Sequence, residues 1–165
     1  MSDTFVTIIA IALAAVLMFI FPLMTMSDRT DDVSQLTVDT ATTEFVDDIR
    51  TTGKITQDKY DKFLQTIGST GNTYNVEMQA QILDENPGKK TTQTQRDKIG
   101  ENVYYSVYTS QIEDKLKEGD IISVDVKNTN QTLSQQLKNF FYKVVGNDTY
   151  TIAASHGGIV TATGK

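Results

Sequence analysis

The sequence contains no cysteine and no tryptophan, a single histidine and only two prolines. Without cysteine the chain has no disulfide scaffold, no thiolate metal site, no cysteine nucleophile and no CxxC redox motif. Positive charge is also scarce, because 15 Lys and Arg stand against 21 Asp and Glu, for a net charge of −6 over 165 residues. A general nucleic-acid binder needs a basic face to meet phosphates. We therefore expect no nucleic-acid partner.

One segment has no charge at all. The run from Phe5 to Met26 is almost wholly apolar, and its only side-chain hydroxyls belong to Thr7 and Thr25. A bilayer core of about 30 Å needs roughly 20 apolar residues in a helix. The sequence therefore predicts a transmembrane helix segment over residues 1–26, with the lipid bilayer as its first partner.

A removed secretory signal peptide is the main alternative for this run. It would need a basic leader, a shorter apolar core and a cleavage site between small residues. The residues before Phe5 include no Lys or Arg, and the run ends in Met-Thr-Met, which favours an uncleaved anchor. A core helix of a soluble protein would show a polar stripe, and this run shows none. The flanks carry too few positive charges to orient the helix across a membrane.

The helix is expected to continue as an amphipathic extension over residues 27–53. No Gly or Pro occurs from Ser27 to Arg50, and Gly53 fits the C-terminal cap. Apolar residues recur every three to four positions in the extension: Val33, Leu36, Val38, Ala41, Phe45, Val46 and Ile49. This stripe must pack either on other subunits or on the chain's own head.

Pro22 lies in the apolar run that precedes the extension. It removes one backbone hydrogen bond and should kink the helix.

Residues 54–165 are predicted to form a small α+β head with four or five antiparallel strands and three short helices. Apolar and polar residues alternate over Tyr74–Ile82, as in a sheet with one buried and one solvated face. Further strands are expected over Val103–Tyr108 and around Ile122–Val126. The expected helices are Gln57–Ile67 after a Thr56 cap, a short helix from Ser110 that presents Ile112 and Leu116, and a helix from about Gln131 to Val144.

Two connecting segments complete the expected head. Residues 85–102, rich in Lys, Thr and Gln around Asn86-Pro87-Gly88, are predicted to form a loop. The chain is predicted to end in a hairpin with a tight turn at His156-Gly157-Gly158.

Candidate catalytic and metal-binding groups are few. His156 is the only histidine, and a turn residue is the simpler interpretation because metal sites usually take three or four ligands. Asp28, Asp31 and Asp32 lack the glycine and terminal glutamate of an EF-hand loop, and are interpreted as a solvated helical turn. No G-x-S-x-G elbow, Walker loop or G-x-G-x-x-G motif occurs. We therefore expect no enzyme activity, no cofactor and no metal; an anchored hydrolase using His156 is the remaining enzymatic alternative.

The layout resembles the type IV pilin and pseudopilin class, including the TadE-like small membrane proteins. The resemblance lies in the run FVTIIAIALAAVLMFIFPLMTM, its helical continuation to Arg50 and the α+β head that follows. In that class such a helix anchors the subunit in the membrane and then bundles with its copies in a filament core. Pro22 matches the class's proline within this helix. Asp3 is the candidate for the class's acidic residue, but it precedes the apolar run, whereas the class has a glutamate inside it. The resemblance implies a single pass through a bacterial cytoplasmic membrane, with the head extracytoplasmic.

The resulting hypothesis is a membrane-anchored structural subunit that assembles through its N-terminal helix into a surface filament or a secretion- or conjugation-associated structure. Its partners would be copies of itself or related pilin-like subunits, and membrane assembly machinery. The alternative is a non-filamentous accessory subunit of a bacterial membrane complex, with the head as a docking domain. The residues expected at the assembly interface are Asp3, Phe5, Pro22, Leu36, Val38, Phe45 and Ile49.

Overall fold

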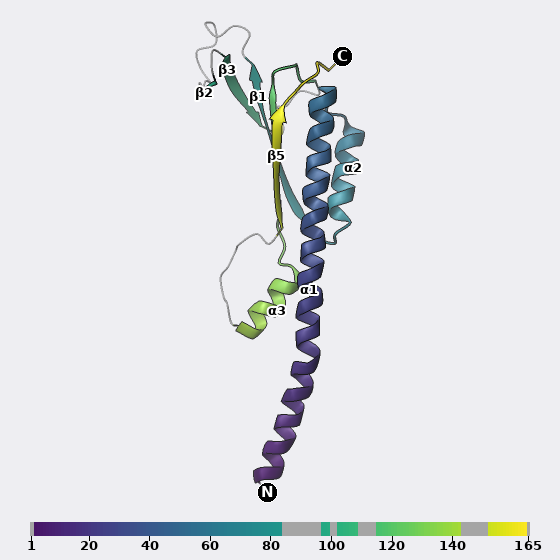
Figure 1. Cartoon of the computed structure of the whole chain (residues 1–165), viewed down its shortest axis with the longest axis vertical. Helices are drawn as coiled ribbons and strands as arrows, with labels where there is room; N and C mark the ends of the chain where they lie inside the picture. Colours follow the sequence, from purple (N-terminus) through teal and green to yellow (C-terminus); the bar gives the residue numbers. More distant parts are fainter. Residues whose placement is uncertain (1, 84–96, 100–101, 109–114, 143–151, 165) are drawn as a thin grey trace.

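The structure, a computed structural model, describes residues 2–83, 97–99, 102–108, 115–142 and 152–164. It opens with one helix of 51 residues, α1 (Ser2–Thr52), which passes through Pro22 without interruption. Figure 1 shows α1 running along the length of the molecule, with the sheet and α2 gathered around its C-terminal half. The predicted continuation of the apolar segment into one long helix is confirmed.

Two short helices and one sheet follow α1. Helix α2 is Gln57–Gly68 and helix α3 is Leu133–Tyr142. The strands are β1 (Tyr74–Leu83), β2 (Asp97–Ile99), β3 (Asn102–Tyr108), β4 (Ile121–Asn128) and β5 (Ala153–Ile159). They form one antiparallel sheet in the order β2-β3-β1-β4-β5. The expected α+β class with an antiparallel sheet is confirmed for the described residues.

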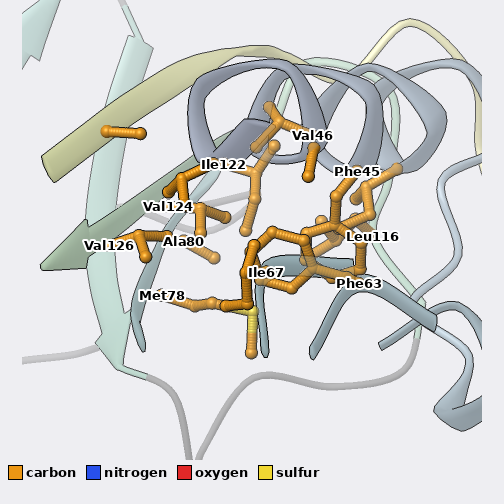
Figure 2. Packing of buried hydrophobic residues seen from close by; sticks show 14 of the residues in the cluster. Phe45, Val46, Phe63, Ile67, Met78, Ala80, Leu116, Ile122, Val124 and Val126 are labelled. Atoms are coloured by element: carbon orange, nitrogen blue, oxygen red, sulfur yellow. The ribbon is translucent and has the colours of Figure 1, made fainter. Parts of the chain in front are cut away.

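The core lies where one face of the sheet meets α1 and α2 (Figure 2). On β4 the alternate residues Ile122, Val124 and Val126 are fully buried, as their period of two predicts. The ring of Phe45 on α1 stacks on Phe63 of α2, with centroids 4.6 Å apart and an interplanar angle of 9°. The buried apolar stripe of α1 consists of Val38, Ala41, Phe45, Val46 and Ile49. The C-terminal half of α1 is therefore part of the head's own core.

The C-terminus of α1 is fixed by Gly53, as predicted. Gly53 has φ of 63°, in the left-handed region, and its N–H donates to the Ile49 carbonyl oxygen at 2.7 Å. A Cβ on Gly53 would lie 2.3 Å from the Ala162 carbonyl oxygen and 2.5 Å from the Gly164 nitrogen. Glycine is thus required twice here, for the backbone conformation and for the close approach of the chain's C-terminal segment.

The predicted terminal hairpin is wrong. His156, Gly157 and Gly158 lie inside the continuous strand β5, which pairs with β4 along its whole length. The two glycines serve close packing instead of a turn: a Cβ on Gly157 would lie 2.9 Å from the Ile122 carbonyl oxygen, and one on Gly158 2.6 Å from Arg50 Nε. Their small size lets β5 pass close to both β4 and α1.

Smaller predictions also need correction. Strand β2 lies within residues 85–102, which were expected to be a loop, and it pairs with β3. Leu116 was expected in a helix from Ser110 but is buried in a non-helical segment. Its backbone N–H donates to the Gly53 carbonyl oxygen at 2.8 Å. Residues 110–114 and 143–144 of the expected helices lie outside the described residues. Thr56 precedes α2 as expected, but its side chain makes no capping hydrogen bond.

Replacing Phe45 tests whether the α1 stripe stabilises the head. Because Phe45 is 5% exposed and stacked on Phe63, we expect Phe45→Ala to lower the free energy of unfolding by about 3–5 kcal/mol. Leu36→Ala is the matched control on the same helix, since Leu36 is 67% exposed, and should change it by less than about 0.5 kcal/mol. Denaturant unfolding of the full chain in detergent micelles measures both. Equal, small effects would contradict this assignment of the core.

Replacing Gly53 tests the junction between α1 and the C-terminal segment. We expect Gly53→Ala to destabilise the chain by roughly 2–4 kcal/mol, from a strained positive φ and from overlap with the neighbouring backbone. Gly68→Ala is the control, because a Cβ there meets nothing within 4 Å and alanine suits a helix end, so stability should stay equal or rise by up to about 1 kcal/mol. Thermal melting of both variants decides the point.

Candidate anchoring and assembly surface

The N-terminal half of α1 presents an exposed apolar surface. Most of its large hydrophobic side chains between Phe5 and Met26 are 46% to 76% exposed, whereas Ile20 and Met24 are half-buried, and none of the most apolar 18-residue window is buried. The helix is long and apolar enough to cross a membrane. Both hydroxyls in this half are satisfied within the helix: Thr7 Oγ1 donates to the Asp3 carbonyl oxygen at 2.8 Å, and Thr25 Oγ1 donates to the Phe21 carbonyl oxygen at 3.1 Å. Such internal pairing suits a lipid surrounding.

Pro22 lies within this half and removes one backbone hydrogen bond from the helix. Proline has no backbone N–H, so the Met18 carbonyl oxygen loses its usual intrahelical donor. Figure 1 shows α1 straight along the head and bending within its N-terminal half. The helix continues on both sides of Pro22, and the kink expected at this residue stays a prediction.

The structure divides the seven predicted interface residues into two groups. Three of them, Val38, Phe45 and Ile49, are buried in the chain's own core. The other four are exposed on α1: Asp3, Phe5, Pro22 and Leu36. Of the two surfaces first considered for the apolar stripe, the chain's own head accounts for most of it.

A second, smaller apolar surface remains on the side of α1 that faces away from the sheet. Val33 and Leu36 are 64% and 67% exposed. In a helix of 3.6 residues per turn, Leu36 lies about 180° from the buried Phe45. Val33 also lines a shallow groove of about 480 Å³ between α1 and the end of α2, together with Arg29, Thr30, Ser34, Thr37, Ser69 and Thr70. This outward face, defined by Val33 and Leu36, is available to another helix.

Immediately after the apolar run, one turn of α1 carries the acidic residues that hold α3 against it. Asp28 accepts hydrogen bonds from the Ser134 hydroxyl and from Lys138 Nζ, the latter at 2.7 Å. The hydrogen bond from Lys138, followed by that from Ser134, holds the pKa of Asp28 below its ordinary value, while burial acts in the opposite direction. Asp31 accepts a hydrogen bond from Thr132 Oγ1 at 2.7 Å. These two half-exposed carboxylates therefore also dock α3, a role that the interpretation as a solvated or lipid-headgroup-facing turn did not include.

Thr132 also begins α3 with a reciprocal cap. The Gln135 N–H donates to Thr132 Oγ1 at 3.3 Å, and the Thr132 N–H donates to Gln135 Oε1 at 3.2 Å. This is a capping box. The same hydroxyl oxygen thus accepts from the α3 backbone and donates to Asp31, so the start of α3 and its contact with α1 depend on one another.

Side chains of α1 also hold the free edge of the sheet. β5 is an edge strand, and at its start Gln35 exchanges two hydrogen bonds with the Ala153 backbone, at 2.7 and 3.0 Å. At its end Arg50 Nε donates to the Ile159 carbonyl oxygen at 3.1 Å. Gln35 and Arg50 lie about 22 Å apart along the helix, which matches the roughly 20 Å span of the strand. An edge that would otherwise invite pairing with another chain is occupied by α1.

His156 belongs to this contact and not to a turn. Its Nε2 lies 3.4 Å from Asp47 Oδ1, and the same carboxylate oxygen accepts from Arg50 Nη1 at 2.7 Å. The hydrogen bond from Arg50, with a smaller one from His156, holds the pKa of Asp47 below its ordinary value against the effect of burial. Among the described residues no three His, Asp or Glu side chains form a group suited to a metal ion.

Sequence reasoning missed the docking roles of Gln35, Asp28 and Asp31. The sequence does show acidic residues directly after the apolar run, and a Thr-x-x-Gln helix start with a lysine, at Thr132, Gln135 and Lys138. These two groups are about a hundred residues apart, so no local periodicity indicates that they contact one another.

Acid should weaken the contact between α3 and α1. Because the folded-state pKa of Asp28 is depressed, its stabilising effect is present above the unfolded-state pKa and is lost as the pH falls through the folded-state pKa. We expect up to about 1 kcal/mol of stability to disappear over the acidic range below the ordinary aspartate pKa of about 4, since the carboxylate is half exposed. Melting of the full chain in detergent across this range measures it. Asp28→Asn should flatten that part of the profile and Asp32→Asn should not; identical profiles would refute the assignment.

Comparisons with protein families, with curated proteins and with solved structures found no match to this chain.

Proposed function

We propose that this chain is a pilin-like structural subunit, anchored in a bacterial cytoplasmic membrane by the N-terminal half of α1. In this proposal it assembles through α1 with copies of itself or with related subunits, into a surface filament or a secretion- or conjugation-associated structure. Membrane assembly machinery would handle the subunits, and the head would lie outside the cytoplasm. No catalytic step is assigned to it.

One observation carries the proposal: α1 has two halves with opposite burial. Over Val38–Ile49 its apolar stripe is buried in the head, whereas the apolar segment Phe5–Met26 projects beyond the head with its surface exposed. Exposed apolar area of this extent requires lipid or protein around it. Because this exposed half continues directly into the packed half of α1, it could span a bilayer and could also pack against the α1 helices of other subunits.

The outward face of α1 extends the exposed surface past the membrane segment. Val33 and Leu36 continue it beyond Met26, on the side that the head leaves uncovered. Pro22 is 11 residues before Val33, so by helical geometry it lies within about 20° of the same side. These residues supply a strip along which a second α1 can pack, interrupted by the exposed Arg29, which lies on the same side four residues before Val33.

The alternative function is that of an accessory subunit that never forms a filament. The observation that favours it is the burial of Val38, Phe45 and Ile49 by the chain's own head, which leaves a smaller surface for contact between subunits. In that case the exposed surface of the sheet or of α1 would dock onto another component of a membrane complex.

Cysteine cross-linking distinguishes the two functions, because the chain has no cysteine of its own. Leu36→Cys places a thiol on the outward face of α1, and Glu77→Cys places one at an exposed position on β1. If α1 helices bundle, oxidation of intact membranes should convert most of the Leu36→Cys protein to disulfide-linked dimers and little of the Glu77→Cys protein. Electron microscopy and blotting of material sheared from cells then test for filaments that contain the subunit.

Two results would count against filament assembly. Leu36→Cys protein that stays monomeric, or that cross-links only to a different protein, favours the accessory subunit. Extraction of the chain by alkaline carbonate would contradict anchoring altogether. Labelling of Glu77→Cys in intact cells by a membrane-impermeant maleimide checks the extracytoplasmic position of the head.

A further inference from the structure

Helix α3 lies at the level where the apolar run of α1 gives way to polar residues. Two polar contacts to α1 come from Ser134 and Lys138, both to Asp28, two residues after Met26. Asp28 is the first charged side chain after the apolar run. Figure 1 shows α3 leaving α1 sideways and slanting toward the N-terminal end of α1. If Phe5–Met26 spans a bilayer, α3 stands at its surface.

The side chains of α3 are arranged as in an amphipathic helix. Leu133, Leu137 and Phe140 follow one another at four and three residues, and so lie on one face. Leu133 is 61% exposed and Phe140 is 78% exposed, although Phe140 also interacts within the chain. The docking residues Ser134 and Lys138 lie on the adjacent side, which is turned to α1. The docking of α3 on α1 thus leaves Leu133 and Phe140 exposed, while Leu137 between them is half-buried.

We propose that α3 is an interfacial helix that inserts Leu133 and Phe140 into the boundary between lipid headgroups and acyl chains. This inference rests on the proposed membrane anchoring of α1 and adds a second point of contact with the bilayer. Helices that lie in this region bury an apolar face by about 5–10 Å, with their polar groups among the headgroups.

Continuity with the apolar surface of α1 identifies lipid as the occupant of this face. Asp28 connects α3 directly to the turn that follows Met26, so the apolar face of α3 adjoins the segment Phe5–Met26. Lys138 is the one charged residue of α3, and Asp28 neutralises it, so α3 brings neither an acidic side chain nor an unpaired charge to the headgroup region. With α1 crossing the bilayer and α3 lying on it, the tilt of the head would be fixed.

Single tryptophans test the inference, because the chain contains none. Leu133→Trp and Phe140→Trp report on α3. Phe19→Trp, at a 73% exposed position in the apolar half of α1, reports on anchoring, and Ile159→Trp, 54% exposed at the far end of β5, is the control in the head. Each full-length variant is reconstituted into vesicles of phosphatidylcholine and phosphatidylglycerol, with phosphatidylcholine brominated either near the headgroup end or near the methyl end of its chains.

Both α3 reporters should lose about half of their emission with bromine near the headgroup end, and less with bromine near the methyl end. Phe19→Trp should be quenched most by the deep bromine, and Ile159→Trp by neither. Quenching of Phe19→Trp with no quenching of either α3 reporter would overturn the inference and leave anchoring intact. Blue-shifted but unquenched emission from α3 would place it against protein, such as a second copy, and would also overturn it. If Phe19→Trp is unquenched as well, the anchoring proposal itself fails.

Discussion

The packing of α1 against the sheet is the contact on which the rest of this structure depends. Val38, Phe45 and Ile49 are buried where α1 packs over β4 and β5, and α2 adds Phe63 and Ile67 to the same core. The head therefore has no complete core without α1. The apolar half and the core half of α1 are one continuous helix, so a force or displacement on the segment Phe5–Met26 acts directly on the folded head, with no linker between them.

The same packing brings α1 side chains to the edge strand β5. A helix packed over the inner face would leave the outer backbone of β5 open to pairing with another chain. Gln35 and Arg50 bond to the two ends of that strand, and Gly158 leaves room for the Arg50 side chain at one of them. The other edge of the described sheet is β2, and the outer face of the sheet also carries exposed residues such as Glu77. The large exposed apolar side chains lie mainly on the apolar half of α1, on its outward face and on α3.

The acidic turn after Met26 lies between the exposed apolar half of α1 and the half that packs on the head. On one side of it, α1 offers only apolar side chains, and on the other it begins to bury small and polar residues such as Ser27 and Ser34. Asp28 and Asp31 dock α3 at this boundary through a lysine, two hydroxyls and a capping box. Charged groups placed at this level can hold an element beside the membrane segment without entering it, because carboxylates avoid the hydrocarbon.

The sequence by itself determined the elements whose signal is local. The uninterrupted apolar run and the absence of Gly and Pro from Ser27 to Arg50 are sufficient for one long helix ending at Gly53, and the alternation over Tyr74–Ile82 is sufficient for a strand with one buried face. Only the tertiary structure decided which surface covers the α1 stripe, that Gly157 and Gly158 lie inside a strand, and that Asp28 and Asp31 dock α3. Each of these depends on residues about 30 to 110 positions away. Periodicity reports the need for a partner, but not which distant segment supplies it.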